Sequence, residues 1–196
     1  MSTATEDKRE QILGAARRLL VRRGFQDVVL DDVARAAGVA KGTLFLYFRN
    51  KDKLFSAAFA DLVDRLGATL DRLIASGKTG RPLLNDTVRE VLSYFELNQD
   101  FMSHFGLGKF PGCGDRSSER LMEKFSANTA RMAAILKRSL DAVGTDQEKL
   151  EFAAVALFGL CRSANVYRLI RRDRRPLVSR ASQVVRLFLR GVEGRP

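Results

Sequence analysis

Hydrophobic residues recur at steps of three and four along almost the whole chain of 196 residues. This spacing places them on one face of an α-helix, whereas a half-buried β-strand would alternate apolar and polar residues. No stretch sustains that alternation, and only 4 prolines interrupt the helical pattern. The sequence therefore predicts an all-α protein with about nine helices.

Capping residues and glycines predict where these helices begin and end. Thr3 with Glu6 and Thr145 with Glu148 have the spacing of capping boxes, and Asn50 can cap the helix that follows it. Segments 77–82 and 109–115 contain the Gly and Pro residues of predicted breaks. The first helix is expected to stop at Gly24 and a seventh to end near Val143, and the others are expected at about residues 30–37, 41–47, 51–76, 82–99, 100–106, 146–172 and 179–192.

Residues 29–48 have the pattern of a helix-turn-helix motif. Val33 and Ala34 face inward on its first helix, and Gly38 supplies a turn that a side chain would resist. Leu44 and Phe48 anchor the second helix. This leaves the following residues on its other faces: Lys41, Gly42, Thr43, Phe45, Leu46 and Tyr47. A helix presented in this way can enter the major groove of DNA.

The stretch of about residues 9–60 resembles the TetR family of bacterial transcriptional regulators. The match lies in Ile12-Leu13-x-Ala15-Ala16, Gly24-Phe25, Val33-Ala34, Ala37-Gly38-Val39, Lys41-Gly42-Thr43-Leu44, Tyr47-Phe48 and Lys51-x-x-Leu54. The resemblance implies a DNA-binding domain at residues 1–54 and an effector-binding and dimerisation domain at residues 55–196. It also implies a homodimer that binds a near-palindromic operator in double-stranded DNA and responds to a small-molecule effector.

The resemblance also assigns roles within the motif. Lys41 and Gly42 are expected to approach bases and phosphates, and Thr43 to contact a phosphate or a base edge. Tyr47 and Lys51 match a tyrosine and a lysine that contact phosphates, although Tyr47 can also be read as a core aromatic with its hydroxyl at the rim.

The chain departs from the family where hydroxyl groups are usual, at Val28, Val29 and Ala40. The residue at position 29 would normally cap the helix and contact a phosphate. Valine cannot cap, and the loss of the cap destabilises the start of the helix by about 1 kcal/mol. Phe45 replaces a usual tyrosine, and Leu46 stands where a polar or aromatic residue is common; both can touch thymine methyl groups. Lys41, Arg49 and Lys51 are then expected to carry more of the phosphate contact. The candidate DNA-binding residues are Val29, Lys41, Gly42, Thr43, Phe45, Leu46, Tyr47, Arg49 and Lys51.

Aromatic and apolar residues of the second half suggest a pocket for an apolar effector of acyl or aromatic type. Asn165 and Arg168 would add polar anchors, while each phenylalanine can equally be plain core. His104, the only histidine, is expected at the surface or in a hydrogen bond. The candidate ligand-binding residues are Phe95, Phe101, Met102, Phe105, Phe110, Phe125, Phe158, Cys161, Asn165 and Arg168.

Residues 150–161 are apolar nearly all round, so that the helix carrying them must be buried on most sides. Small residues there permit close helix approach, and the last helix offers a matching apolar stripe. These two helices are the predicted dimer interface, unless both simply fill the core of one subunit. The candidate interface residues are Ala153, Ala156, Gly159, Ser163, Ala181, Val184, Val185, Phe188 and Leu189.

The net charge of +11 is compatible with a nucleic-acid partner but is unevenly placed. Residues 1–55 carry +4, residues 56–161 carry −1 and residues 162–196 carry +8. The last segment holds a dense arginine cluster, which is either a solvated helix end or an anion site for an acidic or phosphate-bearing effector such as an acyl thioester of coenzyme A. The cluster consists of Arg162, Arg168, Arg171, Arg172, Arg174 and Arg175.

The sequence favours a ligand-responsive repressor over other functional classes. An enzyme is disfavoured because there is one His, no metal-ligand cluster, no phosphate-binding glycine motif and no nucleophile with an evident base, so neither a metal nor a cofactor is expected. An activator or a low-specificity DNA-binding protein remains the alternative. Two cysteines, no uninterrupted apolar run near 20 residues and a charged N-terminus indicate a cytoplasmic protein without a membrane partner.

Overall fold

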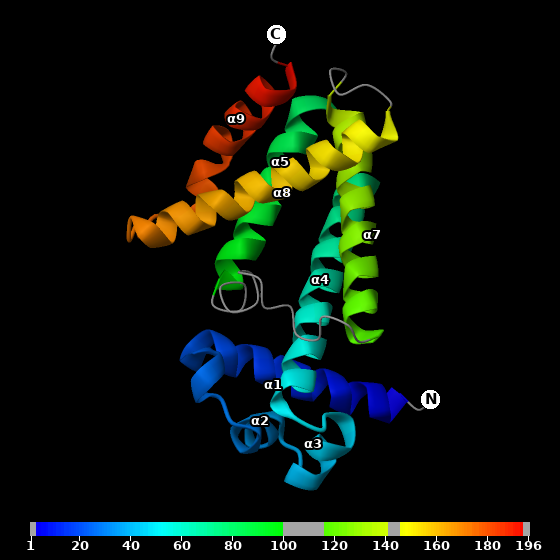
Figure 1. Cartoon of the computed structure of the whole chain (residues 1–196), viewed down its shortest axis with the longest axis vertical. Coiled ribbons are helices and arrows are strands. Elements are labelled where there is room, and N and C mark those ends of the chain that lie inside the picture. Colours follow the sequence, from blue (N-terminus) through cyan, green and yellow to red (C-terminus); the bar gives the residue numbers. More distant parts are fainter. Residues whose placement is uncertain (1–2, 100–115, 141–145, 194–196) are drawn as a thin grey trace. The chain divides into compact units, whose positions relative to one another are not determined.

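The computed structural model describes residues 3–99, 116–140 and 146–193 of the chain. Every regular element in these ranges is a helix, which confirms the predicted all-α class (Figure 1). The elements are α1 (Thr3–Asp27), α2 (Leu30–Ala37), α3 (Lys41–Tyr47), α4 (Lys51–Ala75), α5 (Gly80–Leu97), α7 (Arg116–Ser139), α8 (Gln147–Ile170), the 3₁₀ helix η2 (Leu177–Arg180) and α9 (Ala181–Glu193).

The expected ends of α2 and α3 agree with the structure, whereas several other boundaries differ. The helix α5, for example, spans Gly80–Leu97 in place of the expected 82–99. The helix α1 continues past Gly24 to Asp27, because one glycine costs a helix only about 1 kcal/mol, which tertiary packing can outweigh. The helix α7 ends at Ser139, before the expected Val143. The cap of α8 is Asp146 and not Thr145, since its carboxylate accepts the backbone N–H groups of Glu148 and Lys149. The expected helix at 100–106 and break at 109–115 lie outside the described residues.

The chain divides into two compact units, residues 1–62 with 98–121 and residues 63–97 with 122–196. In the first unit, α1 buries Ile12 and Leu13, and α2 and α3 bury Val33 and Leu44. Asn50 caps α4 as expected, because its Oδ1 accepts the backbone N–H of Lys53 at 2.9 Å. Asp61 of α4 forms an ion pair with Arg17 of α1, which fastens these two helices within the unit.

In the second unit, α7 runs parallel to α4 along a ladder of polar contacts (Figure 1). Lys124 Nζ lies 2.5 Å from Asp64 Oδ1, and Arg131 Nε lies 2.8 Å from Asp71 Oδ1. One heptad further on, Arg138 donates to the carbonyl of Ile74 near the end of α4 and to that of Lys78 just beyond it. The seven-residue spacing on both sides is the repeat that keeps two helices in contact.

Gly67 lies at a close approach of α4 and α7. A Cβ at this position would lie 2.7 Å from Asn128 Oδ1, so that any side chain would displace the asparagine. Asn128 is buried, and its Nδ2 donates to the carbonyl of Val63 at 2.8 Å. The glycine therefore makes room for a buried hydrogen bond between the two helices.

The other helices of the second unit meet at Glu96, near the end of α5. One carboxylate oxygen accepts Arg168 of α8 at 2.6 Å, and the other accepts the backbone N–H of Leu177 in η2 at 2.9 Å. The Arg168 side chain is only 11% exposed, so the pair is largely shielded from solvent. Glu96 thus ties α5 to α8 and to the turn that leads into α9.

Candidate functional site

The turn between α2 and α3 is built on Gly38. Its backbone is left-handed, with φ 67° and ψ 30°, a conformation that glycine adopts without steric cost. The backbone N–H groups of Gly38 and Val39 donate to the carbonyls of Arg35 and Ala34 and close the end of α2. This confirms the turn that the sequence predicts and fixes the angle between the two helices.

The starts of both helices lack side-chain caps, as the substitutions at these positions predict. Val29 and Ala40 have extended backbone and no capping hydrogen bond. Asp32, which would complete a capping box with residue 29, instead accepts Arg23 at 2.7 Å and Arg35 at 3.2 Å. Val29 is left 53% exposed beside the motif.

The helix α3 buries one face and exposes the opposite one. Leu44 is fully buried, and Phe48 just after the helix is nearly so. Leu46 is 86% exposed and Phe45 is 40% exposed, whereas Thr43 and Tyr47 are half-buried. The ring centroid of Tyr47 lies 6.4 Å from that of Phe48, so part of the tyrosine packs against the core side of the motif.

Two of the three candidate cations of the motif, Lys41 and Lys51, have partners within the chain. Lys41 Nζ lies 2.8 Å from Asp31 Oδ1, at the start of α2. Lys51 Nζ donates to the carbonyl of Gln26 at 3.1 Å, and Arg49 is exposed. All nine candidate DNA-binding residues therefore lie within one short part of the first unit, on the segment from the start of α2 to the start of α4.

The described effector candidates lie in the second unit. Phe95, Cys161 and Asn165 are buried, Phe125 and Phe158 are half-buried, and Arg168 pairs with Glu96. The buried Oδ1 of Asn165 accepts no hydrogen bond from the described residues, which is unusual for a group so far from water. Burial raises the pKa of the Cys161 thiol to about 12, so it stays protonated and unreactive. The candidates Phe101, Met102, Phe105 and Phe110 lie outside the described residues, as does His104.

The candidate interface residues fall into two groups. Ala156, Gly159 and Ser163 lie on the exposed side of α8. Those of α9 fill the core of the subunit itself, as does Ala153, and none of the following is more than 6% exposed: Ala181, Val184, Val185, Phe188 and Leu189. For α9, the stripe that suggested an interface is therefore covered by the subunit's own helices.

The outer surface of α8 is apolar. Phe152 and Ile170 are 77% and 73% exposed, Val155 is also exposed, and Leu187 of α9 continues the surface. An open groove of about 1160 Å³ runs between α8 and the end of α9. By length and composition alone, α8 would also qualify as a membrane-crossing helix, a test that core helices of globular proteins pass as well.

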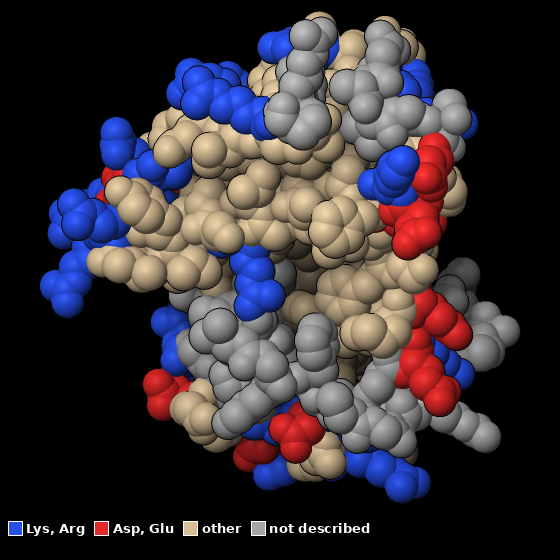
Figure 2. All heavy atoms as spheres, turned by 45° about the horizontal axis from the view of Figure 1, so that its top comes forward, with Lys and Arg blue, Asp and Glu red and all other residues tan. Residues whose placement is uncertain are grey.

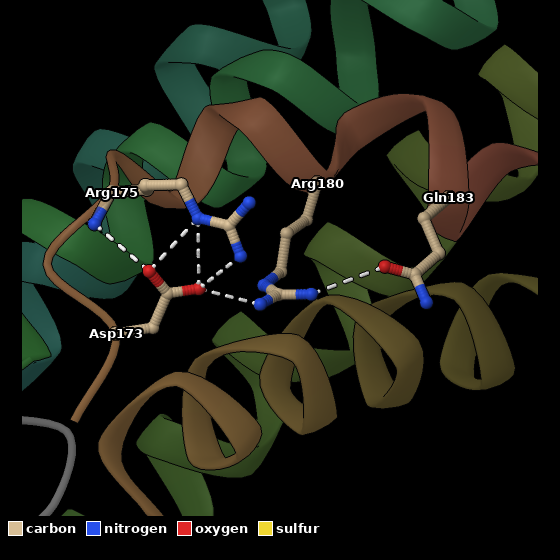
Figure 3. Close-up of polar contacts among 4 residues, drawn as sticks. All are labelled: Asp173, Arg175, Arg180 and Gln183. Carbon is tan, nitrogen blue, oxygen red and sulfur yellow. Dashed lines mark hydrogen bonds and ion pairs between the residues drawn. The ribbon is translucent and has the colours of Figure 1, made fainter. Parts of the chain in front are cut away.

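The arginine cluster is partly neutralised by Asp173 in the turn after α8 (Figure 3). Its carboxylate accepts Arg175 at 2.8 Å and Arg180 at 2.6 Å, and these hydrogen bonds, that of Arg175 foremost, hold the pKa of Asp173 well below its usual range. Arg180 also lies 4.7 Å from the ring centroid of Tyr167. Figure 2 shows Lys and Arg side chains along one edge of a broad uncharged surface on the C-terminal elements.

Several residues that organise these regions carry no signal in the sequence. They are Asp31, Glu96 and Asp173, whose partners lie on another element or across a turn. Only Asp173, isolated among arginines, could have been singled out from the printed sequence.

The segment that contains the helix-turn-helix matches a known protein family. Residues 12–58 match the family model "Bacterial regulatory proteins, tetR family". An uncharacterised HTH-type transcriptional regulator of Haemophilus influenzae is 38% identical over 72 residues, which are 37% of this chain and 38% of that protein. This match thus spans less than half of the relative.

Two solved structures resemble the chain over almost its full length. The fatty acid degradation regulator FadR from Bacillus halodurans has a TM-score of 0.74 at 19% identity, with 96% of this chain and 97% of that one covered. FadR from Thermus thermophilus, a TetR family transcriptional repressor in complex with lauroyl-CoA, has a TM-score of 0.65 at 26% identity, with 96% of both chains covered. The likeness of fold therefore extends to the second unit.

Proposed function

The chain belongs to the TetR family of bacterial transcriptional regulators, and on that premise we propose that it is a homodimeric, ligand-responsive repressor that leaves a near-palindromic operator when a small apolar effector binds. The observation that carries the proposal is the helix-turn-helix closed by Gly38, with the outer face of α3 open to solvent. Such a helix fits the major groove of DNA. The DNA-binding domain comprises residues 1–54, and residues 55–196 form the effector-binding and dimerisation domain.

Within the motif, cations and polar groups bind the DNA backbone while the exposed face of α3 meets the bases. Lys41, Arg49 and Lys51 supply positive charge to phosphates, and Tyr47 and Thr43 supply hydroxyl groups at the edge of the surface. Residues 24–54 carry a net charge of only +1. Attraction to DNA in general is therefore weak, and binding depends on a fitted site.

The partner is a second copy of the chain, paired through the outer surface of α8 and the end of α9. Exposed apolar side chains at Phe152, Val155 and Leu187 need cover, and the small residues Ala156 and Gly159 let another helix approach closely. Pairing also has a mechanical purpose, since two motifs must reach successive major grooves about 34–36 Å apart.

Dimerisation is tested by placing a charge on this surface. Phe152→Glu and Leu187→Glu should yield monomers in sedimentation equilibrium, whereas Leu97→Glu, at a leucine of α5 that is 73% exposed, should leave the dimer intact. A dimer that tolerates both interface charges would place the contact elsewhere.

The effector is an apolar molecule of acyl or aromatic type that binds in the second unit. The complex of Thermus thermophilus FadR with lauroyl-CoA, at 26% identity over 96% of the chain, favours an acyl thioester. Phe95, Phe125 and Phe158 supply apolar surface, and Asn165 keeps an unused buried acceptor that a ligand donor would satisfy. The exposed arginines after α8 are a solvated helix end, or in the alternative a contact for the phosphates of coenzyme A.

The repressor proposal predicts selective DNA binding that an effector reverses. Affinity for an operator from the gene's own upstream region should exceed that for random duplex by about 10³-fold or more at physiological salt. Lauroyl-CoA should release the operator, with free coenzyme A and laurate as matched controls. A ratio near one would leave only a low-specificity DNA-binding protein, and transcription that rises with the protein in a purified system would identify an activator. The proposed regulator is cytoplasmic and catalyses no reaction.

A further inference from the structure

The centre of the outward face of α3 carries no hydrogen-bonding side chain. Gly42 and Leu46 are four residues apart, so they lie one turn apart on the same side of the helix. Leu44, between them in sequence, is fully buried on the other side. What α3 presents at its middle is therefore a bare stretch of backbone followed by an isobutyl group that is 86% exposed.

Gly42 is not required by the fold. A Cβ built on it meets no atom within 4 Å, and the residue is absent from the positive-φ glycines, Gly38, Gly77 and Gly80, of the described chain. Glycine inside a helix is nevertheless less favourable than alanine by about 1 kcal/mol. A short helix of 7 residues thus holds a destabilising residue that nothing inside the described part of the subunit explains. Close approach to something outside the subunit is a physical reason for a missing side chain.

The residues around Leu46 indicate which kind of molecule this surface of α3 fits. Phe45 is 40% exposed beside it, and Val29 lies exposed at the start of α2. Lys41, Arg49 and Lys51 lie in the same segment, so an apolar strip is accompanied by positive charge. This combination fits the DNA major groove, where thymine presents an apolar methyl group beneath two rows of phosphates.

We propose that the outward face of α3 reads the C5-methyl groups of pyrimidines in the major groove, with Gly42 permitting close approach and Leu46 making the contact. Specific hydrogen bonding to guanine, adenine or cytosine commonly uses Arg, Lys, Asn, Gln or an acidic side chain. Neither Gly42 nor Leu46, at the centre of the outward face, is one of these, and Lys41 at the start of α3 is held by Asp31. Thymine and 5-methylcytosine carry the same methyl group at the same place. The inference rests on the proposed function and adds the chemical feature of the operator that is recognised.

The test begins with an operator selected from random duplexes by the full-length protein. Each thymine is then replaced in turn by deoxyuridine, which removes only the C5-methyl group. At contacted positions the affinity should fall about fourfold per methyl, and by the square of that factor when both half-sites are changed. Leu46→Ala should bind the two duplexes equally, whereas Leu97→Ala, at an equally apolar exposed position of α5, should keep the full difference.

A second arm separates the methyl group from the rest of the thymine·adenine pair. At each contacted position a guanine·cytosine pair is introduced with either cytosine or 5-methylcytosine. Tighter binding of the methylated duplex supports the inference, and equal binding overturns it because the other groups of the pair are then being read. Indifference of the selected operator to every deoxyuridine overturns the inference alone, as does a difference that persists in Leu46→Ala. Failure to select any operator overturns the proposed function and the inference with it.

Discussion

Lys41 at the start of α3 is held by Asp31 at the start of α2, with Nζ 2.8 Å from Oδ1 and 2.9 Å from Oδ2. A cation proposed to bind DNA phosphate is thus already paired in the free protein. Both side chains are exposed, so the pair is weak and can exchange for a phosphate, at the cost of leaving Asp31 near the DNA backbone. If Lys41 binds phosphate as proposed, Asp31 is expected to lower the affinity of the motif for every duplex.

Asp31→Asn should tighten binding to operator and random DNA alike by a few-fold, because a repulsive charge is removed and Lys41 is released. The dependence of log K on log salt should become steeper by up to about one ion. Asp64→Asn is the matched control, since Asp64 pairs with Lys124 in the second unit at 2.5 Å. Equal affinities of Asp31→Asn and the native protein would remove this role from Asp31.

Lys51→Ala should weaken binding to all duplexes and flatten the salt dependence by about one ion, because one phosphate contact is lost. In the free protein its Nζ donates to the carbonyl of Gln26, so circular dichroism must first establish that the DNA-binding domain of the variant remains folded. Lys78→Ala, which removes an exposed lysine paired with Asp86, should leave the salt dependence unchanged. An unchanged slope in Lys51→Ala itself would exclude a phosphate contact by this lysine.

Gly42→Ala should separate stability from DNA binding. The new methyl meets no atom of the described residues within 4 Å, so the free energy of unfolding should rise by about 0.5–1 kcal/mol from helix propensity alone. Operator affinity should fall, because the methyl holds α3 away from the base edges. Gly14→Ala is the matched control in α1, since an added Cβ would lie 3.5 Å from the nearest atom, Arg18 Nη1, and it should leave DNA affinity unchanged. Unimpaired operator binding by Gly42→Ala would argue against close approach at this position.

Gly67→Ala should destabilise the second unit. The added Cβ lies 2.7 Å from Asn128 Oδ1, and the strain of overpacking, typically about 1–3 kcal/mol, exceeds the gain in helix propensity of about 1 kcal/mol. Urea unfolding measures the loss. Combining the change with Asn128→Ala should cost less than the sum of the two single changes, since the clash is then absent. Additive costs would mean that the asparagine is not what Gly67 accommodates.

The turn after α8 should lose stability in acid. Asp173 has a lowered pKa in the folded chain, so the folded state binds its proton less tightly than the unfolded one. Its contribution is complete above about pH 4, the ordinary value for aspartate, and disappears as the pH falls through the lower folded value. Melting temperatures of the native protein and Asp173→Asn should therefore differ at pH 7 and converge toward pH 2–3. A difference independent of pH would contradict this, and Asp86→Asn controls for loss of a carboxylate elsewhere.

The helix-turn-helix could be predicted from sequence because its determinants are local. Apolar spacing locates α2 and α3, and the left-handed Gly38 follows from the need for a tight turn. The missing caps at Val29 and Ala40 are likewise visible in the residue types. In contrast, Thr145 and Asp146 are both residue types that can cap a helix, and the sequence does not show that Asp146 is the cap of α8.

Tertiary pairings could not be predicted in the same way. An apolar stripe such as Val184, Val185 and Phe188 shows that a helix face is covered, but not whether its own subunit or another covers it. Glu96 holds Arg168 across 72 positions of sequence, and no local pattern marks that pairing. The exposed and buried apolar residues of α8 look alike in sequence, because the sequence does not show which sides of the helix the rest of the subunit covers.

The ion pairs between α4 and α7 recur every seven residues, so they do not by themselves fix the register of the two helices. If α7 slid by one heptad, Arg131 would face Asp64 and Arg138 would face Asp71, so two oppositely charged pairs would form again. Asn128 would then lie near Ala60 in place of Gly67, and its side chain would collide with a methyl group. The charges attract the two helices in either alignment, while one glycine and one asparagine choose between them. The buried contact between Asn128 and Gly67 thus favours one register of the two long helices over the other.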